Sequence, residues 1–347
     1  MKNELFDALD QLEKEKGITK ETLLDAIEAA LITAYKKNFG SAQNVKVTID
    51  RENGSVKVYS RKEVVEEVET DLFEISLEEA KKIDPNYEIE DIVEREVTPR
   101  NFGRIAAQTA KQVVVQRIRE AERSVIFQEY VNRESEIVTG IVQRISKGTV
   151  YINLGKIEAV LLANEQIQGE VYKHGNRIKT YIVEVKKTTK GPQIAVSRTH
   201  PGLVKRLFEL EVPEIHDGIV EIKGISREAG SRTKIAVYSS DPNIDPVGAC
   251  VGQRGVRVQN IVDELRGEKI DIIKWDEDPS KFISNSLSPS KVLKVEINDE
   301  DKSALVVVPD YQLSLAIGKE GQNARLAAKL TAWKIDIKSE SQYDGSL

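Results

Sequence analysis

Cysteine and histidine are scarce in this chain of 347 residues, and their scarcity excludes several kinds of site. Cys250 is the sole cysteine, so the sequence has no internal disulfide, as is usual for proteins of a reducing cytosol. The three histidines show no metal-ligand spacing, and neither a Walker loop nor a nucleophile motif occurs. We therefore expect that the protein is not an enzyme and that it binds neither a metal nor a cofactor.

Long apolar runs are also missing. No stretch approaches the roughly 20 apolar residues that a membrane helix needs, and the acidic, amphipathic start lacks the apolar core of a signal peptide. With 40% hydrophobic and 31% charged residues, the chain has the composition of a soluble protein that buries several modest cores. We expect a cytoplasmic monomer without membrane contact.

The net charge of −6 argues at first against a polyanionic ligand, but the charge is segregated along the chain. Residues 1–134 hold 21 Lys and Arg against 28 Asp and Glu, a net of −7. Residues 135–200 hold 10 against 5, a net of +5. An acidic first third beside a basic segment suggests a protein partner at one end and a polyanion further on.

Residues 1–134 combine helical and alternating patterns. Apolar residues at helical spacing predict a helix over residues 19–39. Alternating runs then predict four strands, at residues 45–50, 55–60, 63–69 and 91–97. Asn53-Gly54, between the first two runs, is a strong hairpin signal. A long helix that begins near Asn101 closes this α/β segment.

Residues 135–200 change character. Five short alternating runs, separated by glycines and polar turns, predict a small closed barrel, of which the OB-fold is the usual nucleic-acid-binding version. Aromatic side chains of such barrels stack on bases, and the candidates here are Tyr151, Tyr172, Tyr181 and His174. Tyrosines on alternating strands are about as often packing residues.

Residues 201–347 contain an internal repeat, centred on "CVGQRGVR" and "AIGKEGQN". The first glycines of the two motifs are 66 residues apart, 318 minus 252. Each copy reads helix, strand, strand, helix, Gly-x-x-Gly, helix, strand, and each closes on similar letters, "EKIDII" and "WKIDIK". The pattern predicts two small α+β domains of the same topology.

A Gly-x-x-Gly loop between two helices can bind a sugar-phosphate backbone. Glycine adopts the left-handed conformation without penalty, and the missing side chains let the backbone approach. The amides and the dipole of the next helix favour negative charge, and KH domains clamp about four nucleotides in this way. A structural helix-turn-helix connection is the alternative for one loop alone. Recurrence of the whole context around both loops favours RNA.

The chain resembles the NusA family of bacterial transcription elongation factors, in the short form without C-terminal acidic repeats. The segments that carry the resemblance are "GITKETLLDAIEAALITAYKKNFG", "NFGRIAAQTAKQVVVQRIREAER", "KTTKGPQIAVSR", "DPVGACVGQRGVRVQNIVDELRGEKIDIIKW" and "LSLAIGKEGQNARLAAKLTAWKIDI". The resemblance implies a multidomain α+β protein with a polymerase-binding domain at 1–134, a five-stranded OB barrel at 135–200 and tandem type II KH domains (α-β-β-α-α-β) at 201–277 and 278–347. Regulation by acidic repeats is expected to be absent.

The resemblance also implies partners and site residues. RNA polymerase, single-stranded nascent RNA and other Nus antitermination factors are the expected partners, and hairpin-dependent pausing, intrinsic termination and antitermination are the expected roles. The RNA-binding candidates are Gly252, Gln253, Arg254, Gly255, Arg257, Gly318, Lys319, Glu320, Gly321, Gln322, Asn323, Arg325, Tyr151 and His174. Arg104 and Lys111, on a polar face of the long helix, are candidates for contact with polymerase or an RNA hairpin.

The alternative function is an RNA-binding cap subunit of an RNA-degrading complex, which can also combine a barrel with KH domains. The first 134 residues discriminate, because that alternative predicts no polymerase contact from them. The loop interiors also differ: Gln253-Arg254 offers a cation, whereas Lys319-Glu320 offers a cation and an anion. We expect the second loop to bind RNA less strongly than the first.

Overall fold

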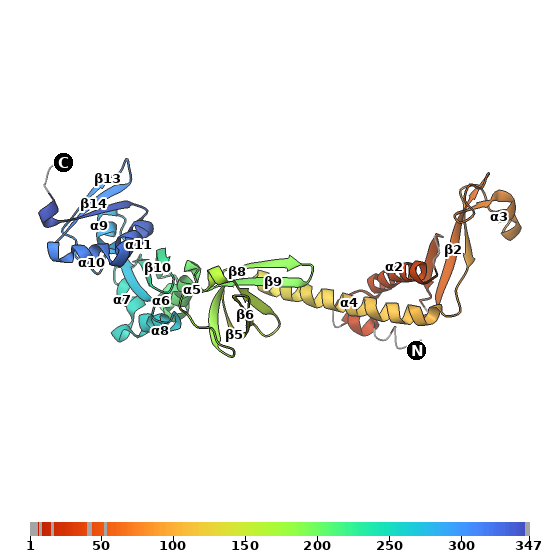
Figure 1. Ribbon diagram of the computed structural model, residues 1–347, viewed down its shortest axis with the longest axis horizontal. Coiled ribbons are helices and arrows are strands. Elements are labelled where there is room, and N and C mark those ends of the chain that lie inside the picture. The colour runs from red at the N-terminus through yellow and green to blue at the C-terminus, as the bar shows by residue number, and fades with distance from the viewer. Residues whose placement is uncertain (1–5, 7–8, 15–16, 40–43, 52–53, 344–347) are drawn as a thin grey trace. The chain divides into compact units, whose positions relative to one another are not determined.

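The structure, a computed structural model, describes residues 6, 9–14, 17–39, 44–51 and 54–343, and it separates into two compact units, residues 1–125 and residues 126–347 (Figure 1). The long helix α4 (Phe102–Val131) crosses from one unit into the other. The other elements of the first unit are α2 (Lys20–Phe39), β1 (Val45–Ile49), β2 (Val56–Val65), β3 (Glu74–Ser76), α3 (Leu77–Ile83) and β4 (Ile92–Glu96).

The first unit is built on the predicted amphipathic helix and a small sheet. Leu23, Ile27 and Leu31 recur at helical spacing along α2 and are fully buried against β1 and the start of α4. Strand β2 pairs with β1 and β4 in antiparallel fashion and with β3 in parallel fashion. Ile49 pairs with Val56, as the predicted hairpin requires, while Asn53 of its turn lies outside the described residues.

The strands predicted at residues 55–60 and 63–69 form one strand in the structure. Strand β2 runs without a break from Val56 to Val65. Neither glycine nor proline separates the two runs, and the charged residues between them are half-buried rather than in the core, so they do not interrupt the ladder. The strand predicted at residues 63–69 was therefore wrong at its C-terminal end, because Glu66 to Glu69 lie beyond the strand that forms.

The second unit begins with the predicted barrel. Its strands close in the order β5-β6-β7-β9-β8, which confirms the five-stranded barrel. The strands are β5 (Ile137–Ser146), β6 (Thr149–Asn153), β7 (Glu158–Leu161), β8 (Arg177–Thr188) and β9 (Gly191–Ser197). Gly140 permits a close approach of the strands, since a Cβ there would lie 2.3 Å from Ile152 Cγ2.

The last turns of α4 pack on this barrel. Tyr130 is 3% exposed and belongs to the barrel core, and Ile126 and Phe127 pack against the same core. Glu134 accepts a hydrogen bond from the Val185 amide at 2.7 Å. A cut made between residues 134 and 135 would therefore remove part of the barrel core, so tests of this protein need the full chain.

Two domains of the same topology follow the barrel. The first contains α5 (Pro201–Glu211), α6 (Pro213–His216), β10 (Val220–Glu228), β11 (Arg232–Ser239), α7 (Pro246–Val251), α8 (Val256–Glu264) and β12 (Lys269–Lys274). The second contains α9 (Pro279–Ser286), β13 (Lys294–Asn298), β14 (Ser303–Val308), α10 (Leu313–Ile317), α11 (Gln322–Thr331) and β15 (Lys334–Ser339).

Both sheets follow one pattern. The first two strands of each domain are antiparallel, and the third runs parallel to the second at the other edge, giving the orders β10-β11-β12 and β13-β14-β15. This is the predicted α-β-β-α-α-β arrangement, and the prediction of tandem type II KH domains is confirmed. We refer to them as the first and second KH domains.

A buried charge network joins the barrel to the first KH domain. Arg198, at the end of the barrel, is 1% exposed and donates to Glu170 at 2.7 Å, whose side chain is 4% exposed. The same guanidinium reaches Glu264 of α8, donating to its carboxylate at 3.3 Å and its carbonyl at 3.0 Å. Burial works against the charged form of Arg198, but Glu170 and Glu264 outweigh it and raise the pKa of Arg198.

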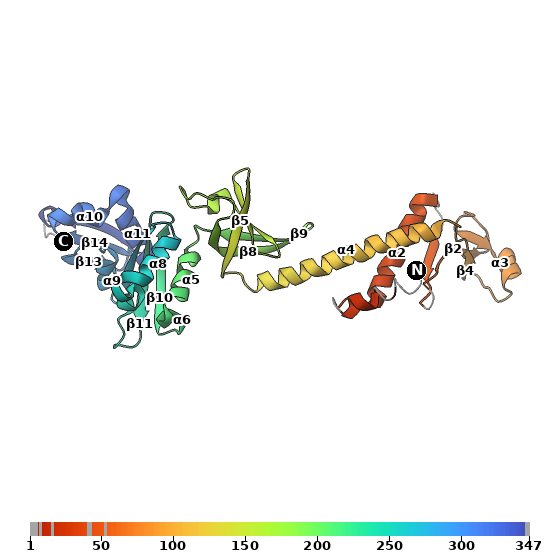
Figure 2. The ribbon, with the colours of Figure 1, turned by 90° about the horizontal axis from the view of Figure 1, so that it is seen from below.

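A second set of polar contacts joins the two KH domains. Lys234 of β11 is fully buried, and its ammonium donates to Asp271 at 3.0 Å and to the Ser288 carbonyl of the second KH domain at 2.8 Å. Helix α11 also packs on β10 of the preceding domain (Figure 2). Gly224 of β10 lies beside Leu330 of α11 at this contact.

Replacement of Arg198 by alanine should strongly destabilise the junction of the barrel and the first KH domain. The change leaves Glu170 buried without its principal cation, which typically costs about 3–5 kcal/mol of unfolding free energy. Urea unfolding followed by the fluorescence of Trp275 and Trp333 measures the effect. Lys156→Ala is the control, because its ion pair with Glu129 is exposed at 64% and 36%. Equal urea midpoints for the two variants would contradict the prediction.

Candidate nucleic-acid interface

The first glycine loop joins α7 to α8. Gly252 has φ 73° and ψ 174°, Arg254 has φ 55° and ψ 24°, and Gly255 has φ 78° and ψ 11°. The Gly255 amide donates to the Gly252 carbonyl at 3.1 Å, which closes the turn. The conformation at Gly252 is one that residues with a Cβ avoid, and the left-handed values at Gly255 favour glycine, whereas Arg254 adopts a left-handed conformation with a side chain.

The second loop, between α10 and α11, repeats this backbone. Gly318 has φ 78° and ψ 171°, Glu320 has φ 53° and ψ 27°, and Gly321 has φ 74° and ψ 13°. The largest difference from the first loop is 5°, between 78° at Gly318 and 73° at Gly252. The Gly321 amide donates to the Gly318 carbonyl at 3.1 Å, as in the first loop. The two predicted loops therefore share one conformation.

Each loop opens a helix whose N-terminus has no side-chain cap. Gly255 precedes α8 and Gly321 precedes α11, and neither position provides a capping hydrogen bond. The first amide of each helix donates back into its loop, from Val256 to the Gln253 carbonyl and from Gln322 to the Lys319 carbonyl. The start of each helix is nevertheless the positive end of its dipole. This combination suits a phosphate group.

The residue five positions after the first glycine braces each loop from behind. In the first loop, Arg257 donates to the Ala249 carbonyl at 2.6 Å and to Glu214 at 2.8 Å. In the second, Asn323 donates to the carbonyls of Ala316 and Leu287, both at 3.0 Å. Both side chains thus return to the helix that precedes the loop.

These braces explain why the first glycine of each loop has no room for a side chain. A Cβ at Gly252 would lie 2.6 Å from Arg257 Cγ, and one at Gly318 would lie 2.7 Å from the backbone nitrogen of Asn323. Asn323 is 2% exposed. Arg257 and Asn323, both predicted to bind RNA, are therefore engaged within the protein, and they shape the loops.

The loop interiors face solvent. Gln253, Arg254 and Lys319 are exposed, and their side chains make no hydrogen bond or ion pair with any residue that the structure describes. Glu320 is also exposed, and its carbonyl accepts a hydrogen bond from Arg325 at 3.0 Å. Each loop therefore presents a cation that no carboxylate neutralises.

Gln322 and Arg325, which were predicted to contact RNA, bind the first KH domain. Arg325 Nε donates to Glu228 of β10 at 2.7 Å, and Gln322 donates to the same carboxylate at 2.8 Å and to Ser231 at 2.7 Å. The hydrogen bond from Arg325 is the main cause of the lowered pKa of Glu228. The second loop is therefore fastened to the neighbouring domain.

The barrel has a stacked pair, Arg144 and Tyr151, of which the sequence analysis identified only Tyr151. Arg144 lies over the Tyr151 ring, 3.5 Å from its centroid, and pairs with Glu158 at 3.0 Å. Arg144 and Tyr151 are partners in the β5–β6 register, so counting outward from the Lys147-Gly148 turn would have found the pair. His174 is exposed in the turn that leads to β8.

The other two aromatic candidates of the barrel serve packing. The Tyr172 hydroxyl donates to Glu170 at 2.8 Å, and burial raises the pKa of Tyr172. Tyr181 stacks on His200 with ring centroids 4.5 Å apart. Neither ring is presented to a ligand.

Arg104 and Lys111 lie on α4 within the first unit, and the structure does not bring them together with the glycine loops or the barrel. Both are exposed and have no ion pair with any described residue. Among the residues that the structure describes, no cluster of three His, Cys, Asp or Glu side chains could hold a metal. No described helix is long and apolar enough to cross a membrane.

Comparison with known proteins matches most of the chain to four domain families. Residues 4–124 match the NusA N-terminal domain, residues 132–197 the S1 RNA binding domain, residues 198–275 the NusA-like first KH domain and residues 279–345 the NusA-like second KH domain. The solution structure of the N-terminal domain of NusA from Bacillus subtilis is 64% identical, covers 35% of this chain and 99% of that chain, and has a TM-score of 0.33.

Relatives match over nearly the whole length. The transcription termination/antitermination protein NusA of Halalkalibacterium halodurans is 65% identical over 342 residues, which are 99% of this chain and 90% of the relative. That of Bacillus subtilis is 65% identical over 341 residues, 98% of this chain and 92% of the relative. The resemblance seen in the sequence is confirmed: the chain belongs to the NusA family of transcription termination/antitermination proteins.

Proposed function

We propose that the chain binds RNA polymerase and nascent single-stranded RNA, promotes hairpin-dependent pausing and intrinsic termination, and takes part in antitermination with other Nus factors. In this proposal, residues 1–134 contact the polymerase, while the barrel (135–200) and the KH domains (201–277 and 278–347) bind the transcript. The observation that carries the proposal is the pair of glycine loops with one backbone conformation, each opening an uncapped helix.

The backbone of each loop is suited to a phosphodiester group. Gly255 and Gly321 leave the start of the following helix without a side chain, since a Cβ at either would meet no other atom closer than 3.9 Å, so a sugar-phosphate backbone can approach there. Arg254 and Lys319 then supply an unneutralised cation beside each loop. Phosphate contacts of this kind position the strand, and the sequence is read by groups along the bases.

The predicted RNA-binding residues divide into two groups in this proposal. Gln253, Arg254 and Lys319 contact the strand directly. Arg257 and Asn323 act through the loop shape, as do Gln322 and Arg325, which hold the second loop against Glu228. Glu320 adds a negative charge beside the second loop, so we expect weaker binding there.

In the barrel, the Arg144–Tyr151 stack and the exposed His174 are the proposed contacts. A guanidinium on a tyrosine ring presents a flat cationic surface, which can stack on a base and attract the adjacent phosphate. An RNA-binding cap subunit of an RNA-degrading complex is a weaker proposal, because it leaves the match of residues 4–124 to the NusA N-terminal domain without a role.

Replacement of both loop interiors by Asp-Asp should weaken the binding of single-stranded RNA. The change at Gln253-Arg254 alters the charge by −3, and the change at Lys319-Glu320 by −2, so the first should cost more affinity. Each lost phosphate contact should flatten the slope of log affinity against log salt by about 0.7. Fluorescence anisotropy of a labelled RNA at several salt concentrations measures both quantities.

The control for charge alone is Lys81-Lys82→Asp-Asp, on the exposed end of α3 in the first unit. It changes the charge by −4 and should leave RNA affinity unchanged. Circular dichroism checks that each variant is folded. Unchanged affinity and slope in the chain with both loops replaced would exclude the loops as RNA contacts.

Charge reversal at Arg104 and Lys111 should reduce the lengthening of hairpin pauses without changing the affinity for free single-stranded RNA. Both side chains are exposed and unpaired on one face of α4, so reversal alters an interface and not the fold. A defined transcription assay with purified polymerase measures pause duration. Arg119→Glu with Arg123→Glu, further along the helix, is the matched control. Full pause lengthening by the Arg104 and Lys111 variant would contradict the role of these two residues.

A further inference from the structure

A groove with cationic and hydroxyl groups lies where the two KH domains meet. Its volume is about 460 Å³, and its lining includes Lys274 at the end of β12, Ser284 and Asn285 of α9, and Ser288 and Lys291 of the following loop. We call it the junction groove. None of the residues of the two glycine loops lines this groove.

The groove has the charge expected of a phosphate site. No Asp or Glu occurs in its described lining, whereas Lys274 and Lys291 both contribute to it. Both lysines are exposed, and their ammonium groups have no ion pair or hydrogen bond with any described residue. Two unneutralised cations in one groove repel each other, and an anion between them relieves that repulsion.

The groove is also held in shape. Asn285 donates to the Lys274 carbonyl at 3.1 Å, which fixes the end of β12 against α9. The buried ammonium of Lys234 donates to the Ser288 carbonyl at 2.8 Å, and the Ser290 hydroxyl donates to the Leu287 carbonyl at 3.0 Å. The Lys274 and Lys291 side chains therefore extend from a rigid frame, which limits the entropy lost on binding.

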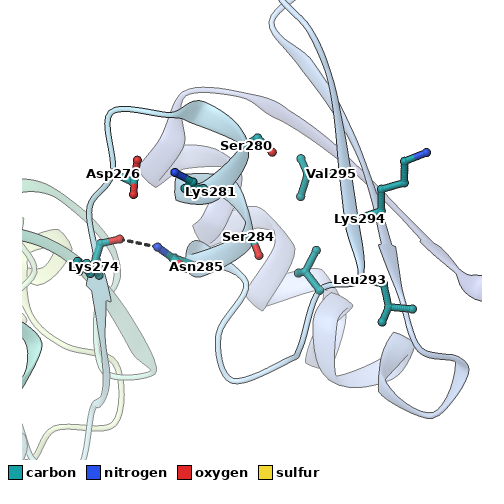
Figure 3. A pocket seen from close by; sticks show the side chains of 10 residues that line it. Lys274, Asp276, Ser280, Lys281, Ser284, Asn285, Leu293, Lys294 and Val295 are labelled. Carbon is teal, nitrogen blue, oxygen red and sulfur yellow. Dashed lines mark hydrogen bonds between the residues drawn. The ribbon is translucent and has the colours of Figure 1, made fainter.

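An adjoining hollow extends the groove along α9 (Figure 3). It has a volume of about 430 Å³, shares Lys274, Ser284 and Asn285 with the junction groove, and adds Ser280 and Lys281 one turn earlier on the helix. Its lining also includes Asp276, and Lys281 lies 3.9 Å from Asp278. Lys294 points away from α9 in Figure 3 and is paired with Glu296, so it does not contribute to our inference. The donors along α9 are hydroxyl, amide and ammonium groups, which suit phosphate oxygens.

A third hollow adjoins Lys274 within the first KH domain. It has a volume of about 330 Å³ and is lined by Lys274 together with Tyr238, Trp275 and the start of α7, and also by Asp241, Asp276 and Glu277. The Tyr238 and Trp275 rings meet edge to face, with centroids 5.3 Å apart. Helix α7 leads into the first glycine loop and packs by β12, so this hollow lies on the side of the first KH domain that carries that loop.

The strand order places α9 and α10 at opposite edges of one sheet. In the sheet β13-β14-β15, helix α10, which precedes the second glycine loop, packs by β15, and helix α9, which lines the groove, packs by β13. The end of α9 is still joined to the second loop, because Asn323, which braces that loop, donates to the Leu287 carbonyl at 3.0 Å. The groove therefore lies beside the support of the second loop.

We propose that the junction groove binds the phosphate backbone of single-stranded RNA that leaves the first KH domain. Lys274 and Lys291 neutralise its phosphates, and Ser280, Ser284 and Asn285 donate hydrogen bonds. This inference rests on the proposed RNA-binding function. The proposed contacts are to phosphates, which carry no sequence information directly.

A nucleic acid strand fits these features better than an acidic peptide. Lysines act as point charges that accept a phosphate from many directions, and the hydroxyl and amide groups beside them in the groove are donors that suit phosphate oxygens. The domains on either side both match KH families.

The test compares a short and a long RNA on the full chain with Lys274→Gln and Lys291→Gln. An RNA of about eight nucleotides fills the two glycine loops, at about four nucleotides each, and an RNA of about 20 nucleotides also reaches the groove. The variant should bind the short RNA normally. It should bind the long RNA roughly three- to tenfold more weakly, with a salt slope flatter by about 1.4 for two lost contacts.

The matched control is Lys81→Gln with Lys82→Gln, which removes the same charge from exposed lysines of α3. Protection of Lys274 and Lys291 from acetylation by the long RNA, but not by the short one, supports the groove. Unchanged affinity for the long RNA overturns the proposal, and so does protection by a polyglutamate peptide alone. If the unchanged chain binds neither RNA, the proposed function fails, which is distinguishable from failure of the groove.

Discussion

Charged side chains that have left water must keep their partners, and this constraint holds the three RNA-binding folds of the second unit together. Arg198 is almost fully buried, and its carboxylate partners come from the barrel and from the first KH domain. Lys234 plays the same part between the KH domains through Ser288. Because separating these groups exposes unpaired buried charge, the folds act as one body and not as modules on a flexible linker.

The same constraint reaches the second glycine loop. Arg325 binds Glu228 of the neighbouring domain and the Glu320 carbonyl of the loop with one guanidinium. The first loop has no such link to another domain and is braced within its own by Arg257 and Glu214. The loops therefore share a backbone, but only the second depends on the packing of the two KH domains against each other.

Local patterns predicted much of this structure, and long-range contacts could not be predicted. Gly252 and Gly318 revealed the loops because a positive φ is a property of the residue itself, and alternation revealed the barrel because its strands are neighbours in sequence. In the sequence, Arg325 was interpreted as a free cation, because its partner Glu228 lies 97 residues away. Asn323 was interpreted as a surface residue, because nothing nearby in sequence shows that it is buried. The sequence thus indicated the glycine loops, but it did not show the contacts within the protein that Arg257, Asn323 and Arg325 make.

The brace five positions after the first glycine has an evolutionary consequence. An arginine in one copy and an asparagine in the other reach carbonyls of the preceding helix, at Ala249 and Ala316, and the backbones agree within 5° at Gly252 and Gly318. The brace therefore supports the shape of the loop, while the side chains of the two residues between the glycines are not needed for it, although Arg254 and Glu320 must adopt the same left-handed conformation. After duplication of an ancestral domain, those two positions could diverge freely, so that the copies came to differ in ligand preference while keeping a common fold.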